Sequence, residues 1–253
     1  MAINFVEYPE FGAQRRTAGR FSNMIPLIFI PGMMLDARLF SPQIAAFEGE
    51  RTVLVAPVAE ESTISGMAAA ILRSAPARFA LAGLSLGGIV AMEVFRQAPE
   101  RVERLALMDT NPLAELEKVQ KNRDRQIAWV DGEGRLAEVM QDEMKPNYLA
   151  DGPKRADILD LCMEVAMALG PTVFVNQSRA LQSRPDQSDT LRRVKVPTLI
   201  ICGEQDALCP VERHKLMGEL IPHANLVIIP GAGHLPTLEQ PEATTDALRK
   251  WLE

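Results

Sequence analysis

The fold is decided by the stretch Gly83-Leu84-Ser85-Leu86-Gly87-Gly88, which joins the apolar run Phe79–Ala82 to a helical pattern beginning near Leu86. This is a G-x-S-x-G sequence between a predicted strand and a predicted helix. Small residues two positions before and after the serine permit a turn tight enough to strain the serine backbone. The hydroxyl then projects beside the free N–H groups of the helix start, which favour a developing negative charge. Ser85 is therefore the candidate nucleophile.

Two other glycine-rich sites can be excluded at this stretch. A phosphate-binding loop needs a Gly-Lys-Ser/Thr ending, which is missing here. The glycine spacing also differs from a dinucleotide-binding fingerprint, and the preceding strand is not the first of the fold.

Short runs rich in Val, Ile and Leu recur along the chain, and most end at Gly, Pro or Asp. Continuous apolar runs of this length indicate strands buried on both faces, as in a parallel sheet. Helical patterns lie between them, which predicts a layered α/β architecture. The expected strands are Pro26–Ile30, Thr52–Val55, Phe79–Ala82, Leu105–Met108, Thr198–Cys202 and Leu226–Ile229. The expected helices beside them are Ile64–Ser74, Leu86–Ala98, Val211–Leu220 and Glu242–Leu252.

The interval between Asp109 and Val196 has no strand-like run. An irregular loop of that length is unusual, so we predict a helical insertion at residues 113–190 within a core formed by residues 1–112 and 191–253. Its expected helices are Ala114–Asp131, Gly134–Glu143, Asp157–Leu169 and Thr172–Leu181. Before the core, Ile3–Tyr8 is a candidate edge strand.

A serine hydroxyl needs a base, usually a histidine held by a carboxylate. Of the three histidines, His214 is expected on the surface of a helix and His223 in a turn. His234 follows the last expected strand, and Gly231 and Gly233 allow a sharp loop there. Parallel strands place their carboxyl ends on one edge, so His234 can reach Ser85 and is the predicted base.

Asp206 follows the Thr198–Cys202 strand on the same edge, and the order Ser, Asp, His fits a known catalytic arrangement on such sheets. Glu204 lies nearby and is expected to be solvated. Asp109 is the alternative acid, because it ends the preceding strand on the same edge. We favour Asp206 because the acid must reach the far nitrogen of the histidine. Asp109 is then expected to anchor the start of the insertion through local hydrogen bonds.

The elbow at Ser85 and the loops of Asp206 and His234, in this order, resemble the α/β-hydrolase superfamily. The likeness runs from about Pro26 to the end of the chain. Within the superfamily, the chain resembles pimeloyl-carrier-protein methyl ester esterases, 3-oxoadipate enol-lactonases and meta-cleavage C–C hydrolases. The resemblance implies an α/β-hydrolase fold, with a mostly parallel central sheet flanked by helices and with residues 113–190 as a helical cap.

The resemblance also implies an oxyanion hole made by two backbone N–H groups, those of Met33 and Leu86. Pro31 stands where the family usually has histidine, which changes the support of that loop. Six cap and loop residues are candidates for an adaptable apolar pocket, although packing of the cap against the core remains an equal alternative. These residues are Met34, Met140, Met144, Met163, Met167 and Phe174.

The resemblance implies hydrolysis of a small or medium carboxylic ester through an acyl-enzyme, with a small-molecule acyl substrate. The same triad acting on a C–C bond, a lactone, a thioester or in perhydrolysis is an open alternative. A non-catalytic ligand-binding protein on the same scaffold is another. Serine at position 85 disfavours dehalogenases and epoxide hydrolases, which need a carboxylate nucleophile.

Composition narrows the class further. The chain has 253 residues, 47% hydrophobic and 24% charged, which is typical of a globular enzyme. Its net charge of -6 argues against a nucleic-acid partner. Cys162, Cys202 and Cys209 lack metal-ligand spacing, so we predict no disulfide, metal or other cofactor, and an inert core thiol at Cys202. Ile25–Pro31 is too short to span a bilayer, and we expect a cytoplasmic protein without a membrane partner. The sequence does not predict an oligomeric state.

Overall fold

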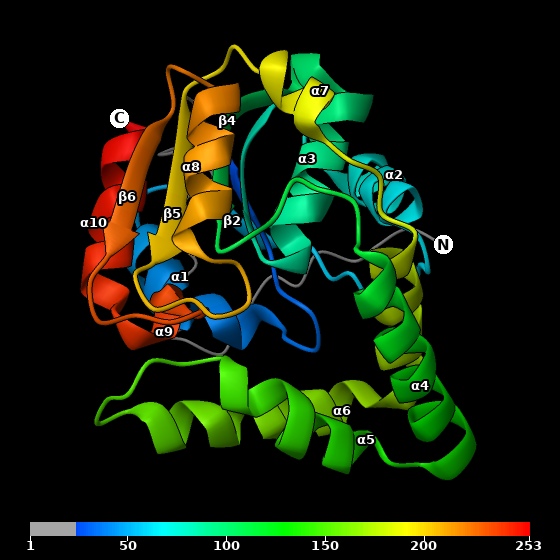
Figure 1. Cartoon of the computed structure of the whole chain (residues 1–253). Helices are drawn as coiled ribbons and strands as arrows, with labels where there is room; N and C mark the ends of the chain where they lie inside the picture. Colours follow the sequence, from blue (N-terminus) through cyan, green and yellow to red (C-terminus); the bar gives the residue numbers. More distant parts are fainter. Residues whose placement is uncertain (1–23) are drawn as a thin grey trace.

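A computed structural model describes residues 24–253 and contains a six-stranded sheet with the order β2-β1-β3-β4-β5-β6 (Figure 1). Every neighbouring pair of strands is parallel. The strands are β1 (Leu27–Ile30), β2 (Val53–Val55), β3 (Phe79–Leu84), β4 (Val102–Met108), β5 (Thr198–Gly203) and β6 (Asn225–Ile229). All six expected strands are thus confirmed within a few residues. The predicted strand Ile3–Tyr8 lies outside the described residues.

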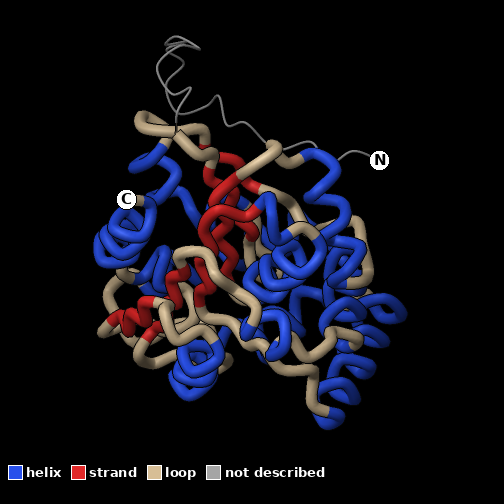
Figure 2. The backbone as a smooth tube through the Cα atoms, turned by 90° about the horizontal axis from the view of Figure 1, so that it is seen from above, coloured by secondary structure: helices blue, strands red, loops and turns tan. Residues whose placement is uncertain are grey.

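Helices cover both faces of this sheet, which explains why the buried parts of its central strands are mostly apolar (Figures 1 and 2). α1 and α10 pack together on one face, and α2, α3 and α8 form the layer on the other. Strands β1, β3 and β5 are buried along their whole lengths. These helices are α1 (Ser41–Phe47), α2 (Ile64–Ser74), α3 (Leu86–Gln97), α8 (Val211–Leu220) and α10 (Pro241–Leu252).

Shorter helices connect these layers. None of them was expected from the sequence, because each spans only a turn or two and has no helical period to detect. They are η1 (Ala37–Phe40), η2 (Pro99–Arg101), α7 (Ser188–Arg192) and α9 (Pro236–Glu239).

The chain between β4 and β5 is helical, as predicted, and crosses below the carboxyl ends of the strands (Figure 1). It contains α4 (Glu117–Glu133), α5 (Leu136–Glu138), η3 (Val139–Met144), η4 (Lys145–Asn147) and α6 (Arg155–Gln182). The two helices expected at 157–169 and 172–181 run together in α6. They meet at a kink, where Gly170 has φ 80° and ψ 178° and precedes Pro171. This arrangement fits the proposed cap at residues 113–190.

Within residues 24–253, α6 is the one helix long and apolar enough to cross a membrane, with a mean hydropathy of 1.8 over 18 residues. Core helices of folded proteins meet the same criterion. Here the helix is broken at Gly170, and Cys162 and Phe174 on its two halves are fully buried. The helix therefore packs as part of the fold, and the absence of a membrane partner stays a prediction.

Candidate active site

Ser85 lies at the sharp turn between β3 and α3. Its backbone has φ 56° and ψ -117°, a conformation that a residue with a side chain rarely adopts. The turn closes because its glycines carry no side chain. A Cβ atom on Gly83 would lie 2.2 Å from the carbonyl oxygen of Gly87, and one on Gly87 would lie 2.0 Å from that of Ile30. The predicted strained elbow is therefore present.

Two bonds to the neighbouring strand end hold this elbow. The Ser85 N–H donates to the carbonyl of Met108 at 2.9 Å. The hydroxyl of Thr110 donates to the Ser85 carbonyl at 2.7 Å. Backbone strain persists where surrounding contacts fix the residue, and these contacts do so on the β4 side.

His234 and Asp206 meet at the carboxyl edge of the sheet. Asp206 Oδ2 lies 2.9 Å from His234 Nδ1, and both side chains are buried. The other oxygen, Asp206 Oδ1, accepts from the N–H groups of Leu208 and Cys209 at 2.8 and 3.0 Å. Burial opposes ionisation of Asp206, but the facing imidazole and these N–H groups lower the pKa of its carboxyl. Asp206 is therefore suited to hold an imidazole in one orientation.

The loop that carries His234 is tied to the helical segment by Glu239. One carboxylate oxygen of Glu239 accepts from Gly233 N at 2.9 Å and Ala150 N at 2.8 Å, and the other accepts from Leu235 N at 2.9 Å. The His234 N–H donates to the carbonyl of Tyr148 at 2.7 Å. Glu239 was not predicted from the sequence, because a carboxylate in a short helix carries no signal that distinguishes it from a solvated one.

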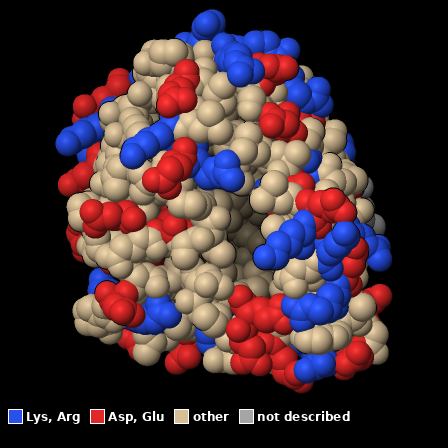
Figure 3. Space-filling view, in the orientation of Figure 1, with Lys and Arg blue, Asp and Glu red and all other residues tan. Residues whose placement is uncertain are grey.

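Ser85 and His234 both line a cavity of about 520 Å³ beneath the sheet edge, visible as a hollow in Figure 3. Within residues 24–253, neither the Ser85 hydroxyl nor His234 Nε2 has a hydrogen-bond partner. Catalytic hydrogen bonds are often long before a substrate is bound. Both groups are thus available to a ligand in the cavity.

Met33 and Leu86, the predicted oxyanion donors, also line this cavity. In the described part of the chain, neither of their N–H groups has a protein acceptor. The next amide, of Met34, donates to Gln177 Oε1 at 2.8 Å, while Gln177 Nε2 donates to the carbonyl of Val58 at 3.0 Å. Gln177 from α6 therefore positions the Met33 loop. It was missed because its role depends on a contact across the fold.

Of the six predicted pocket residues, Met144 lines the cavity. The other five do not, which corrects the prediction for them. Met34, Met140 and Phe174 are fully buried. Met163 packs against the core, and Met167 is 40% exposed. Helical spacing identifies a buried face but not which cavity that face meets. The alternative, packing of the cap against the core, fits the four residues other than Met167.

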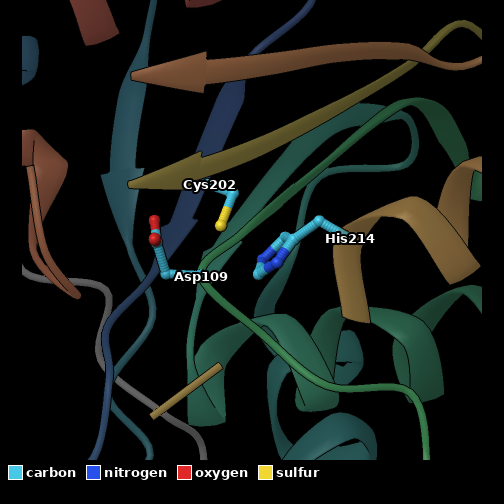
Figure 4. Close-up of side chains that lie close together, drawn as sticks. All are labelled: Asp109, Cys202 and His214. Atoms are coloured by element: carbon cyan, nitrogen blue, oxygen red, sulfur yellow. The ribbon is translucent and has the colours of Figure 1, made fainter. Parts of the chain in front are cut away.

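Asp109 and His214 belong to a second buried cluster, with Cys202 (Figure 4). Asp109 Oδ1 accepts from Gly203 N at 2.8 Å. This bond crosses to β5, so the prediction that Asp109 makes local hydrogen bonds is wrong. His214 is fully buried rather than on the surface. Its Nε2 accepts from Thr110 N at 3.1 Å, and its Nδ1 lies 3.3 Å from the carbonyl of Pro210. Contacts between distant segments explain both corrections: β4 and β5 are neighbours in the sheet, and His214 on α8 reaches the Thr110 amide just after β4.

This second cluster does not have the chemistry of a metal site. Metal ligands must be deprotonated and have a free lone pair. Burial lowers the pKa of His214 to about 4 and raises the pKa of the Cys202 thiol, and both imidazole nitrogens already face backbone groups. Burial also raises the pKa of Asp109, helped by the neighbouring charge of Asp206. All three groups are stabilised in their neutral forms.

His223 is exposed in a turn, as predicted, and its Nε2 lies 3.0 Å from the carbonyl of Val196. Glu204 is exposed, and Cys202 is a buried free thiol, which confirms both predictions.

Residues 27–247 match the sequence model of the alpha/beta hydrolase family. The chain belongs to the α/β-hydrolase family. A relative of this hydrolase, a pimeloyl-[acyl-carrier protein] methyl ester esterase of Nitrosomonas europaea, is 29% identical over 182 residues, which cover 66% of this chain and 68% of that protein. A thermophilic esterase from Thermogutta terrifontis has a similar structure, with a TM-score of 0.81 at 28% identity over 92% of this chain and 90% of that one.

An enol-lactonase from Burkholderia xenovorans has a TM-score of 0.79 at 20% identity, covering 91% of this chain and 92% of that one. At that identity the likeness supports the fold alone. The family and fold implied by the sequence motifs are thus confirmed.

Proposed function

We propose that this hydrolase cleaves a small or medium carboxylic ester through an acyl-enzyme, with Ser85, His234 and Asp206 as its triad. One observation carries the proposal: a buried Asp206–His234 hydrogen bond lies at the wall of the cavity that also contains the strained Ser85. The esterases among its relatives support an ester as the substrate.

In the proposed reaction, Ser85 Oγ attacks the ester carbonyl carbon while His234 Nε2 takes the hydroxyl proton. Asp206 stabilises the imidazolium, and the N–H groups of Met33 and Leu86 stabilise the oxyanion. The C–O bond to the alcohol then breaks, and His234 delivers the proton to the leaving alcohol. Water, deprotonated by His234, attacks the acyl-enzyme carbonyl. The C–O bond to Ser85 then breaks, His234 returns the proton to Ser85 Oγ, and the acid is released.

The size of the cavity supports a small-molecule acyl substrate, because about 520 Å³ lies in the usual range of such sites. Besides substrate and water, the proposed steps use only groups of the chain itself, so the reaction needs no cofactor. A cytoplasmic location, without nucleic-acid or membrane partners, completes the proposal.

Turnover of a p-nitrophenyl acyl ester by wild type and by Ser85→Ala tests the function. We expect the variant to lose about 10⁴-fold or more in kcat, because the nucleophile is removed. The control Ser62→Ala changes an exposed serine and should match wild type. Unchanged turnover in Ser85→Ala would overturn the proposal.

A fluorophosphonate probe gives an independent measurement. It should label Ser85 in the folded wild type and leave Ser85→Ala unlabelled. Absence of an adduct on folded wild-type protein would instead favour a ligand-binding protein on this scaffold.

A further inference from the structure

The cavity that contains Ser85 has an excess of positive charge in its wall, although the whole chain has a net charge of -6. Lysine or arginine atoms border the hollow in Figure 3. The charged residues of the wall are Arg123, Arg184, Arg213, Glu115 and Glu143. An electropositive site in an acidic protein points to a ligand of opposite charge.

The two glutamates do not neutralise this wall. Glu115 is almost fully buried and is shared between two cations, with Arg123 Nε at 2.7 Å and Arg184 Nη2 at 2.9 Å. Glu143 is bound by Arg125 at 2.6 Å, and Arg125 is not among the lining residues. Three arginines therefore line the cavity with two carboxylates that are already paired, so the wall keeps a net positive charge.

Arg213 differs from the other two arginines of the wall. It lies on α8, is half-buried, and its guanidinium has no hydrogen bond or ion pair with any residue in the range 24–253. A guanidinium offers five N–H donors in a fixed plane, which suits bidentate binding of a carboxylate. A half-buried arginine without a protein anion at the edge of a catalytic cavity is thus ready to bind an anion from solution.

The excess of positive charge in the wall also acts on the neighbouring Arg184. Burial lowers the pKa of Arg184, and although Glu115 opposes the shift, the charges of Arg123 and Arg213 add to it. An anion placed between Arg184 and Arg213 would relieve this repulsion while leaving the ion pairs of Glu115 in place.

We propose that Arg213, backed by Arg184, binds a carboxylate of the substrate, so that the preferred ester is a monoester of a dicarboxylic acid. This inference rests on the proposed function, because it places the anion in the cavity of Ser85. Arg213 is then a specificity-determining residue that orients the acyl chain with its ester toward Ser85 and its carboxylate toward α8.

Two p-nitrophenyl esters of similar length separate charge from size: the butyrate, which is neutral, and the hydrogen glutarate, which carries one carboxylate. We expect wild type to prefer the glutarate ester. In Arg213→Gln the ratio of the two kcat/KM values should fall about 10- to 100-fold, mainly through KM, because a charge-assisted bidentate contact is lost. Arg213→Lys should restore part of the ratio.

Arg192→Gln is the matched control. Arg192 is 59% exposed in its side chain and does not line the cavity, so this variant removes the same charge elsewhere and should keep the wild-type ratio. Raising the ionic strength should lower the wild-type ratio and have little effect on that of Arg213→Gln.

Calorimetric binding of glutarate to the whole protein tests the subsite without catalysis. Arg213→Gln should bind glutarate at least about 10-fold more weakly than wild type and Arg192→Gln. Equal affinity in wild type and Arg213→Gln, or no measurable binding to wild type, would overturn the carboxylate subsite alone. If wild type did not turn over either ester but bound glutarate in a way that depends on Arg213, the proposed function alone would be overturned.

Discussion

Two neighbouring clusters contain the same three residue types and serve different ends. In each, the ligand atoms of an aspartate, a cysteine and a histidine lie within 4.8 Å of one another. In the first, the carboxylate bonds the imidazole and the ring borders the cavity. In the second, the carboxylate bonds a backbone N–H and the ring faces backbone groups at both nitrogens. The clusters are Asp206, Cys209, His234 and Asp109, Cys202, His214.

The partners of each group, rather than its residue type, decide its charge. Asp206 gains a facing imidazole and two N–H donors, so its pKa is lowered despite burial. Asp109 has one N–H donor and a buried Oδ2 without a partner among the described residues, so burial raises its pKa. The second cluster nevertheless serves the first. His214 accepts from Thr110 N, and the Thr110 hydroxyl donates to the Ser85 carbonyl. One cluster is suited to reaction and the other to support of the elbow.

The largest expected effect breaks the first cluster. Asp206→Asn should lower kcat for a p-nitrophenyl ester by about 10⁴-fold, because an amide favours the wrong imidazole tautomer and does not stabilise the imidazolium. Steady-state kinetics of Asp206→Asn beside Asp109→Asn measures the contrast. If Asp109→Asn were the inactive variant and Asp206→Asn retained turnover, the assignment of the acid would be reversed.

The second expected effect concerns the pH dependence of stability. The pKa of His214 is about 4 in the folded protein and 6.5 unfolded, so between these values the unfolded chain binds the proton. Stability is therefore complete above pH 6.5 and is lost as pH falls toward 4, by about 3 kcal/mol in total. Denaturant unfolding at pH 7.5 and 5 should show most of this loss in wild type and less of it in His214→Gln.

His223→Gln is the control for that measurement, because His223 is exposed and lies in a turn. His223→Gln should lose as much stability between pH 7.5 and 5 as wild type does. If His214→Gln and wild type lost equal stability between pH 7.5 and 5, His214 would not be a buried neutral base. The two clusters would then no longer differ in the charge of their histidines.

The sequence predicted the parts of this contrast that depend on strand order. Ser85, Asp206 and His234 each follow a strand, and parallel strands bring their carboxyl ends to one edge, so the loops meet without any knowledge of side-chain contacts. The apolar runs were equally informative, because strands covered by helices on both faces are mostly apolar along their buried parts.

The contacts of the second cluster and of Gln177 could not be predicted from the sequence, for a common physical reason. His214 was expected on the surface, since one histidine in a polar helix does not reveal which face packs inward. Asp109 was expected to bond locally, because a turn aspartate after a strand usually does, whereas its acceptor oxygen is used by Gly203 on the next strand. Gln177 bonds a loop distant in sequence. Contacts between distant segments leave no periodic signal.

A smaller effect, opposite in sign to that of His214, is expected from Asp109→Asn. Because the folded pKa of Asp109 is raised, wild type loses stability as pH rises above 3.8 and through that folded pKa. The amide has no such dependence and can still accept from Gly203 N. The difference in Tm between Asp109→Asn and wild type should therefore increase with pH, with kcat within about threefold of wild type. A difference that decreases with pH would show that Asp109 is ionised and stabilised in the fold.

The smallest expected effect separates the two thiols. Cys202 is a fully buried residue of β5, whereas Cys209 lines the cavity. Cys202→Ala removes buried apolar volume and should cost about 1–2 kcal/mol of stability in denaturant unfolding, with kcat/KM unchanged. Cys209→Ala enlarges the cavity and should alter KM with a smaller loss of stability. The reverse pattern would place the substrate against β5 rather than beside α8, and would thereby move the anion subsite away from Arg213.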